Sequence, residues 1–146
     1  MMILMVQARK SNHIKQEEKN RRDIVLEYFN LVKEGRFKEG LKFFSPDCVT
    51  HNPYVNGNMD TLTDAMISAS RDINNQNSEP AFSVKQVLVD GDFVAVHTDL
   101  LNSKSNATKG GLRQVHLFRF NGDKVVEYWD ITQQILPDMP NAGRAF

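Results

Sequence analysis

Residues 112–134 read LRQVHLFRFNGDKVVEYWDITQQ, and this stretch decides the fold. Two runs rich in β-branched and aromatic residues flank Asn121-Gly122-Asp123, which is a strong hairpin signal. The same pattern lies upstream, where Asp90-Gly91 separates a run over Phe82–Val89 from one over Phe93–Thr98. The second half of the chain therefore predicts a meander of antiparallel strands.

The first half of the chain has helical periodicity instead. Apolar residues recur at helical spacing from about Asn20 to Glu34, and a shorter helix is expected over Phe37–Phe44. A third helix is expected to begin with Asp60 or Thr61 as its N-cap. Helices followed by antiparallel strands indicate an α+β fold, in which three N-terminal helices cover one face of a sheet.

Composition and charge exclude several classes of protein. The 146 residues suit one domain, and the formal net charge of zero argues against a nucleic-acid partner. Cys48 is the only cysteine, so no intrachain disulfide forms, which fits a cytoplasmic protein. The apolar run at residues 1–6 is too short for a membrane span or a signal peptide, so no membrane association is expected.

These features divide the chain into three parts. We expect a poorly ordered extension over residues 1–18, one domain over 19–136 and an irregular tail over 137–146. The apolar start of the extension is either a frayed tail or a stretch that packs on a partner subunit.

Alternation along the last hairpin groups candidate site residues on one face. If Asn121-Gly122-Asp123 is a three-residue turn, His116 lies opposite Tyr128, and Gln114 lies opposite Asp130. A two-residue turn would shift the register by one and break this grouping. Histidine and carboxylate in an apolar concavity are the usual groups for proton transfer near neutral pH.

Four segments occur in an order typical of a known family: residues 49–53 (VTHNP), 92–97 (DFVAVH), 117–120 (LFRF) and 124–133 (KVVEYWDITQ). With them the chain resembles the SnoaL-like polyketide cyclase group of the nuclear transport factor 2-like superfamily, and in particular its branch of predicted aldol-condensation enzymes. The resemblance implies a cone-shaped, cystatin-like fold whose curved sheet encloses a pocket. It also implies a homodimer through the outer sheet face and a small hydrophobic ligand or substrate.

The resemblance implies His51, His97 and Asp130 as pocket residues, with Asp130 as the preferred acid/base. An acidic residue is usual where His116 stands, and a histidine where Tyr128 stands. In the implied cofactor-independent chemistry, Asp130 removes a proton beside a carbonyl and His116 or Tyr128 donates to the enolate oxygen. The catalytic candidates are Asp130, His116, His51 and His97, and the substrate-contact candidates are Tyr128, Gln114, Phe118, Asn52 and Trp129.

Three hypotheses follow from these residues. The first is an aldol-type cyclase, isomerase or dehydratase, the second a non-enzymatic small-ligand-binding domain, and the third a dimeric module with a vestigial pocket. Each residue also has a structural alternative: Asp130 could bridge a neighbouring histidine or tyrosine, His51 could cap the turn, His97 could be a hydrogen-bonded strand histidine, and Trp129 could pack at an interface or in the core. No short metal-ligand spacing or glycine-rich phosphate loop occurs, so neither a metal nor a cofactor is expected.

Overall fold

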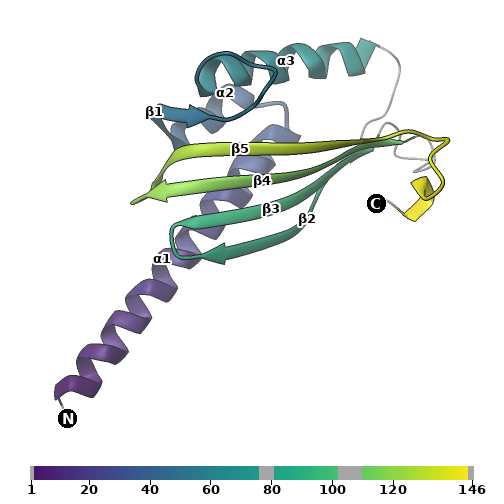
Figure 1. Ribbon diagram of the computed structural model, residues 1–146. Coiled ribbons are helices and arrows are strands. Elements are labelled where there is room, and N and C mark those ends of the chain that lie inside the picture. Colours follow the sequence, from purple (N-terminus) through teal and green to yellow (C-terminus); the bar gives the residue numbers. More distant parts are fainter. Residues whose placement is uncertain (1, 76–80, 102–109, 145–146) are drawn as a thin grey trace.

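The computed structural model describes residues 2–75, 81–101 and 110–144 and has the expected α+β order (Figure 1). Three helical segments precede the first strand of a five-stranded sheet, a further helix lies between its first and second strands, and a short 3₁₀ turn follows the last. The sequence also predicts polar loops over residues 74–80 and 101–110, and these fall mostly outside the described residues. The elements are α1 (Met2–Lys33), α2 (Phe37–Gly40), η1 (Leu41–Phe43), β1 (Phe44–Thr50), α3 (Met59–Asn75), β2 (Ala81–Asp90), β3 (Phe93–Leu101), β4 (Gly111–Asn121), β5 (Lys124–Ile135) and η3 (Ala142–Arg144).

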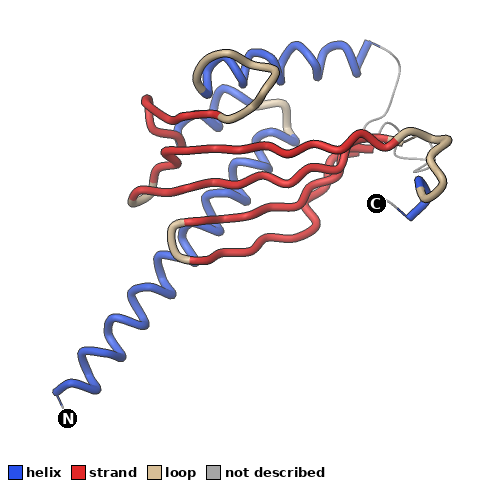
Figure 2. Tube along the Cα trace, viewed as in Figure 1, coloured by secondary structure: helices blue, strands red, loops and turns tan. Residues whose placement is uncertain are grey.

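The sheet is a curved layer with strand order β1-β5-β4-β3-β2, and Figure 2 shows α1 crossing one of its faces. Strands β2 to β5 form the predicted antiparallel meander. Strand β1 differs, because it pairs with β5 in parallel. The sheet is therefore antiparallel except at the β1 edge, where the chain arrives from the helices.

The core lies between α1 and the face of the sheet that we call the inner face. Val25, Tyr28 and Phe29 of α1 recur at helical spacing and are buried. They pack against alternate residues of the strands, and the rings of Phe29 and Phe118 lie 5.8 Å apart, edge to face. Each fully buried side chain of this size stabilises the fold by about 1.5–3 kcal/mol. The residues of the inner face that belong to this hydrophobic core are Val94, Val96, Phe118, Phe120, Val125 and Tyr128.

Helix α1 begins at Met2, whereas the sequence predicts a helix only from about Asn20. Residues 7–20 are mostly good helix formers, and the Gln16 amide donates to Asn20 Oδ1 at 2.9 Å along the helix. The helix meets the body near Arg21, whose Nη1 donates to the Gly91 carbonyl at 2.7 Å. Side chains from Met5 to Gln16 are exposed, so this part of α1 projects beyond the sheet (Figure 1).

Two helix boundaries also differ from prediction. Helix α3 is capped by Asn58, whose Oδ1 accepts from the backbone N–H groups of Asp60 at 3.1 Å and Thr61 at 3.2 Å. The predicted second helix divides into α2 and η1 and gives way to β1 at Phe44.

The register of the last hairpin corrects the sequence prediction. Asn121 pairs with Lys124, so the turn has two residues, and Gly122 takes a φ of 60° there. A bulge follows directly, because Phe120 pairs with Val125 but the next pair is Arg119 with Glu127. The short turn shifts the pairing by one residue and the bulge shifts it by one more. The side chains of β5 therefore stay on the face of the sheet that the sequence predicts.

The expected cross-strand pairs are nevertheless wrong. His116 lies opposite Asp130 rather than Tyr128, and Gln114 lies opposite Thr132 rather than Asp130. Tyr128 lies opposite Phe118. The two-residue turn and the bulge each moved the partners along β5 by one residue, and a total shift of two keeps each side chain on its own face.

Candidate functional site

The inner face opens toward one end of the β4–β5 hairpin. Along β5, Tyr128 is 2% exposed, Asp130 is partly buried and Thr132 is exposed. Along β4, His116 is 5% exposed and Gln114 is partly buried. Asp130 therefore lies at the rim of the apolar core, neither in bulk solvent nor fully enclosed.

The two oxygens of the Asp130 carboxylate have different surroundings. Oδ2 accepts a hydrogen bond of 2.6 Å from the Asn52 amide nitrogen. Oδ1 is buried and has no hydrogen-bond partner among the described residues. Burial raises the pKa of Asp130, and the Asn52 bond opposes that rise. The carboxylate is thus held by one oxygen, and the lone pairs of the other have no hydrogen-bond partner among the described residues.

Asn52 is itself held in one orientation. Its Oδ1 accepts from the Tyr54 backbone N–H at 2.8 Å, so its NH₂ group is the end that faces Asp130. The backbone N–H of His51 donates to the Tyr128 carbonyl at 2.9 Å and carries the β1–β5 pairing to this point. Because the chain is extended before Pro53, the side chains of His51 and Asn52 point to opposite sides of β5.

A second polar group lies deeper on the inner face. His116 bonds through Nδ1 to the Tyr128 hydroxyl at 2.7 Å and through Nε2 to the Thr98 hydroxyl at 2.9 Å. Burial lowers the pKa of His116 to about 3 and raises that of Tyr128. The imidazole is therefore neutral at pH 7, and both of its nitrogens are occupied.

This chain of bonds has two possible directions. A neutral imidazole carries one N–H, so it donates to one hydroxyl and accepts from the other. If Nε2 donates to Thr98, the Tyr128 hydroxyl donates to Nδ1. If Nδ1 donates instead, Tyr128 accepts and its own proton is available to another acceptor.

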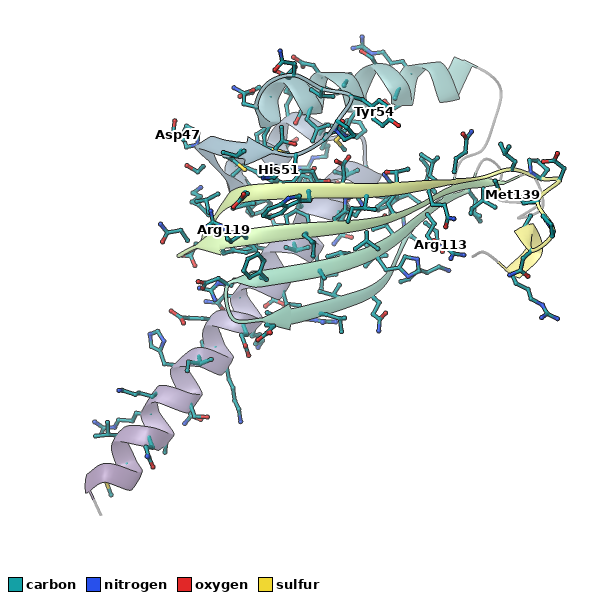
Figure 3. All side chains as sticks on the ribbon, in the orientation of Figure 1. Asp47, His51, Tyr54, Arg113, Arg119 and Met139 are labelled. Atoms are coloured by element: carbon teal, nitrogen blue, oxygen red, sulfur yellow. The ribbon has the colours of Figure 1, made fainter. Side chains whose placement is uncertain are left out.

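His51 and Trp129 lie on the outer face and do not join Asp130. Their rings stack at 4.6 Å with an interplanar angle of 8°. His51 Nε2 is 2.8 Å from Glu127 Oε1, and Arg119 Nε donates to Glu127 Oε2 at 2.7 Å. Figure 3 labels His51 beside β5 and Arg119 near the β4–β5 turn. The sequence predicts that His51 lines the pocket and that Trp129 contacts substrate. In the structure, both side chains lie on the face of the sheet opposite Asp130.

His97 also lies on the outer face. Its Nε2 is 3.2 Å from Asp99 Oδ1, and Lys85 Nζ is 3.5 Å from Asp99 Oδ2. The adjacent Thr98 faces inward and is fully buried against His116. Sequence reasoning missed Thr98, although it continues the inner-face alternation of Val94 and Val96 along β3.

The remaining candidates lie on the inner face in different settings. Gln114 donates through its amide to the Thr132 hydroxyl at 3.1 Å, at the open end of the hairpin. Phe118 is 1% exposed and belongs to the core. Across the described residues, no three His, Cys, Asp or Glu side chains cluster as a metal site would require. In the same part of the chain, no helix combines the length and the apolar character that crossing a membrane requires.

Comparison with known proteins agrees with this architecture. A family model described as the SnoaL-like domain matches residues 25–128. No curated protein matches the chain.

Solved structures resemble the chain at low sequence identity. AclR of Streptomyces galilaeus, a proposed hydroxylase, is 18% identical with a TM-score of 0.64, and the match covers 88% of this chain and 99% of that one. A SnoaL-like polyketide cyclase of Agrobacterium tumefaciens str. C58 is 14% identical with a TM-score of 0.60, over 77% of this chain and 92% of that one. A protein with a cystatin-like fold from Methylobium petroleophilum PM1 is 13% identical with a TM-score of 0.61, over 88% and 91%. At these identities the likeness concerns the fold.

Proposed function

Because the chain belongs to the SnoaL-like domain family, we propose that it is a cofactor-independent acid/base enzyme that acts on a small hydrophobic carbonyl compound. The reaction is an aldol-type cyclisation, an isomerisation or a dehydration. All three begin when a base removes a proton from the carbon beside the carbonyl.

The observation that carries this proposal is the geometry of Asp130. Oδ2 is fixed by Asn52 at 2.6 Å, and Oδ1 has no partner among the described residues. Because burial raises its pKa, the carboxylate is a stronger base than an exposed aspartate. Asp130 Oδ1 accepts the substrate proton, and Asn52 acts as a positioning residue that keeps Oδ1 directed away from its own amide.

The enolate oxygen that forms needs a hydrogen-bond donor. Both nitrogens of His116 are already bonded, so His116 is not that donor. Tyr128 takes this role when His116 Nδ1 donates to its hydroxyl, since the Tyr128 proton then points elsewhere. His116 and Thr98 therefore act through Tyr128, and His51 and His97 have no part in the reaction.

A non-enzymatic ligand-binding domain is the second candidate. It is favoured by the closed Thr98–His116–Tyr128 chain, which commits three polar side chains to one another. It is also favoured by the positions of His51 and His97, which leave Asp130 without a histidine partner among the described residues. In this case the same inner face holds an apolar ligand and Asp130 fixes its polar end.

The test measures proton abstraction directly. The bicyclic ketone 2-tetralone is incubated in D₂O, and exchange of its α-protons is followed by NMR with and without the protein. We expect the wild-type chain to accelerate exchange and Asp130→Asn to lower that acceleration by about 10²–10⁴-fold. Asp123→Asn is the matched control, because it removes the same charge from the exposed β4–β5 turn.

Two results would reject the enzymatic proposal. Exchange by Asp130→Asn at the wild-type rate would remove Asp130 as the base. Saturable binding of 2-tetralone without any accelerated exchange would instead support the ligand-binding domain.

We further propose that two copies of the chain associate through the outer face of the sheet. Four large apolar side chains on this face are exposed: Leu88 at 59%, Phe93 at 45%, Val115 at 38% and Ile131 at 60%. Large exposed apolar side chains that gather on one face of a sheet are typical of an interface. Ile131→Lys should convert a dimer into a monomer in light scattering, whereas a monomeric wild-type chain would contradict the proposal.

A further inference from the structure

A hollow of about 340 Å³ lies where the C-terminal tail folds back over the end of the sheet. Arg113, Gln133 and Ile135 line it from β4 and β5, and Met139, Asn141 and Arg144 line it from the tail. Arg113 pairs with Gln133 across the strands, on the outer face, so the hollow lies on the opposite side of the sheet from Asp130. Figure 3 labels Arg113 and Met139 at this end of the hairpin.

The hollow is positively charged. Two of its lining residues are arginines, and none of the lining residues that the structure describes is acidic. The nearest acidic residue on the neighbouring strand is Asp99, the register partner of Arg113 on β3. Asp99 Oδ1 lies 3.2 Å from His97 Nε2, and Asp99 Oδ2 lies 3.5 Å from Lys85 Nζ but has no hydrogen-bond partner among the described residues.

One N–H of Arg113 lacks an acceptor within the described part of the chain. Its Nε is buried and has no hydrogen-bond partner there, and the guanidinium makes no ion pair there. A buried N–H without an acceptor is unfavourable, because its lost hydration is not replaced. An anion in the hollow would provide an acceptor for this guanidinium.

The other walls define the rest of the ligand. Gln133 and Asn141 provide carboxamide donors beside the two guanidinium groups, while Ile135 and Met139 provide apolar surface. A volume of about 340 Å³ is at the lower end of small-molecule sites. We infer that the hollow binds a small organic carboxylate with an apolar body, its carboxylate on Arg113 and Arg144 and its body against Ile135 and Met139.

This inference is independent of the proposed catalysis, since none of its residues contacts Asp130. It does constrain the proposed dimer, because both use the outer face. The second copy must cover Val115 and Ile131 and leave the end of the hairpin beneath the tail accessible. Absence of binding to the assembled wild-type protein would therefore count against the site.

The experiment is a titration of the full-length protein with benzoate, followed by the side-chain amide signals of Gln133 and Asn141 in ¹H–¹⁵N NMR spectra. Benzamide supplies the same ring without the charge, and inorganic phosphate supplies charge without the ring. We expect saturable shifts of both amides with benzoate and little response to either control. Equal binding of benzamide, or binding of phosphate in place of benzoate, would overturn the assignment.

Three variants locate the charge. Arg113→Gln and Arg144→Gln should each weaken benzoate binding by on the order of tenfold, as loss of one charge-assisted hydrogen bond predicts. Arg119→Gln is the matched control, because it removes the same charge from the same face of β4 at its other end. Arg144 is exposed on the tail, so its variant remains informative if Arg113→Gln does not fold. Unchanged affinity in both hollow variants would reject the site.

Discussion

The inner face of the β4–β5 hairpin has a deep part and a rim that treat their ionisable groups differently. In the deep part, both nitrogens of His116 are bonded, to Thr98 and to Tyr128. At the rim, Asp130 lies directly opposite His116 on β5, yet only one of its oxygens has a partner among the described residues. His116 is fully hydrogen-bonded, whereas Asp130 keeps one oxygen without a partner in the described part of the chain.

Burial acts on the two groups with opposite consequences for pH dependence. It lowers the pKa of His116 to about 3 and raises the pKa of Asp130, since in each case it disfavours the charged form. The His116 effect destabilises the fold as the pH falls. The Asp130 effect has the opposite sign, because a raised folded pKa gives stability that is present at low pH and lost as the pH rises through it. A satisfied network thus contributes to stability at neutral pH, and an unsatisfied carboxylate contributes reactivity there.

The largest expected effect concerns acid unfolding through His116. The unfolded chain takes up a proton near the ordinary pKa of 6.5, whereas folded His116 does so only near 3. Between these values the unfolded state binds more protons, so stability falls by about 1.4 kcal/mol for each pH unit of acidification. Urea denaturation at pH 7, 6, 5 and 4 measures this loss.

The matched variant is His116→Gln, which keeps a polar side chain but cannot titrate. Its unfolding free energy should depend less steeply on pH between 6 and 4 than that of the wild type. Identical slopes in the two proteins would mean that His116 is solvated or charged in the fold, and the distinction between deep part and rim would fail.

Much of the fold follows from local sequence patterns. The turn residues and the alternation along β2 to β5 predict the meander, and the spacing of Val25, Tyr28 and Phe29 predicts the buried face of α1. The pairs across β4 and β5 did not follow, because a two-residue turn and a bulge displaced them together. A bulge depends on how β5 packs in three dimensions, which the turn sequence does not encode.

The site was predictable for Asp130, His116 and Tyr128, since they share a strand face. It was not predictable for the residues just after β1 and on β3, which were assigned to the pocket from the resemblance and not from alternation. His51 and Asn52 are consecutive in an extended segment, so only one of them can reach the inner face, and that one is Asn52. The same argument exchanges His97 for Thr98. The sequence shows that neighbouring residues of an extended segment lie on opposite faces. Only the parallel register of β1 with β5 shows which of them faces inward.

The intermediate effect isolates the deep part. Thr98→Val keeps the volume of Thr98 and removes the hydroxyl that lies 2.9 Å from His116 Nε2. A buried nitrogen without a partner costs about 1–3 kcal/mol, so the unfolding free energy at pH 7 should fall by that amount. Exchange of 2-tetralone protons should change far less than in Asp130→Asn, because Asp130 keeps both its position and its environment. A loss of exchange as large as that of Asp130→Asn would mean that the support of Tyr128 by Thr98 and His116 matters as much as the base itself.

The smallest effect isolates the rim and separates positioning from folding. Asn52→Ala removes the 2.6 Å bond to Asp130 Oδ2, a bond that lowers the pKa of Asp130 against the effect of burial. The pKa of Asp130 should therefore rise, and the ascending limb of the exchange rate against pH should move to higher pH. The maximal rate should fall by about tenfold as the carboxylate loses its fixed orientation. If Asn52 were purely structural, Asn52→Ala would lower the unfolding free energy and leave the position of that limb unchanged. Asn56→Ala, at an exposed position in the same loop, is the control that should move neither quantity.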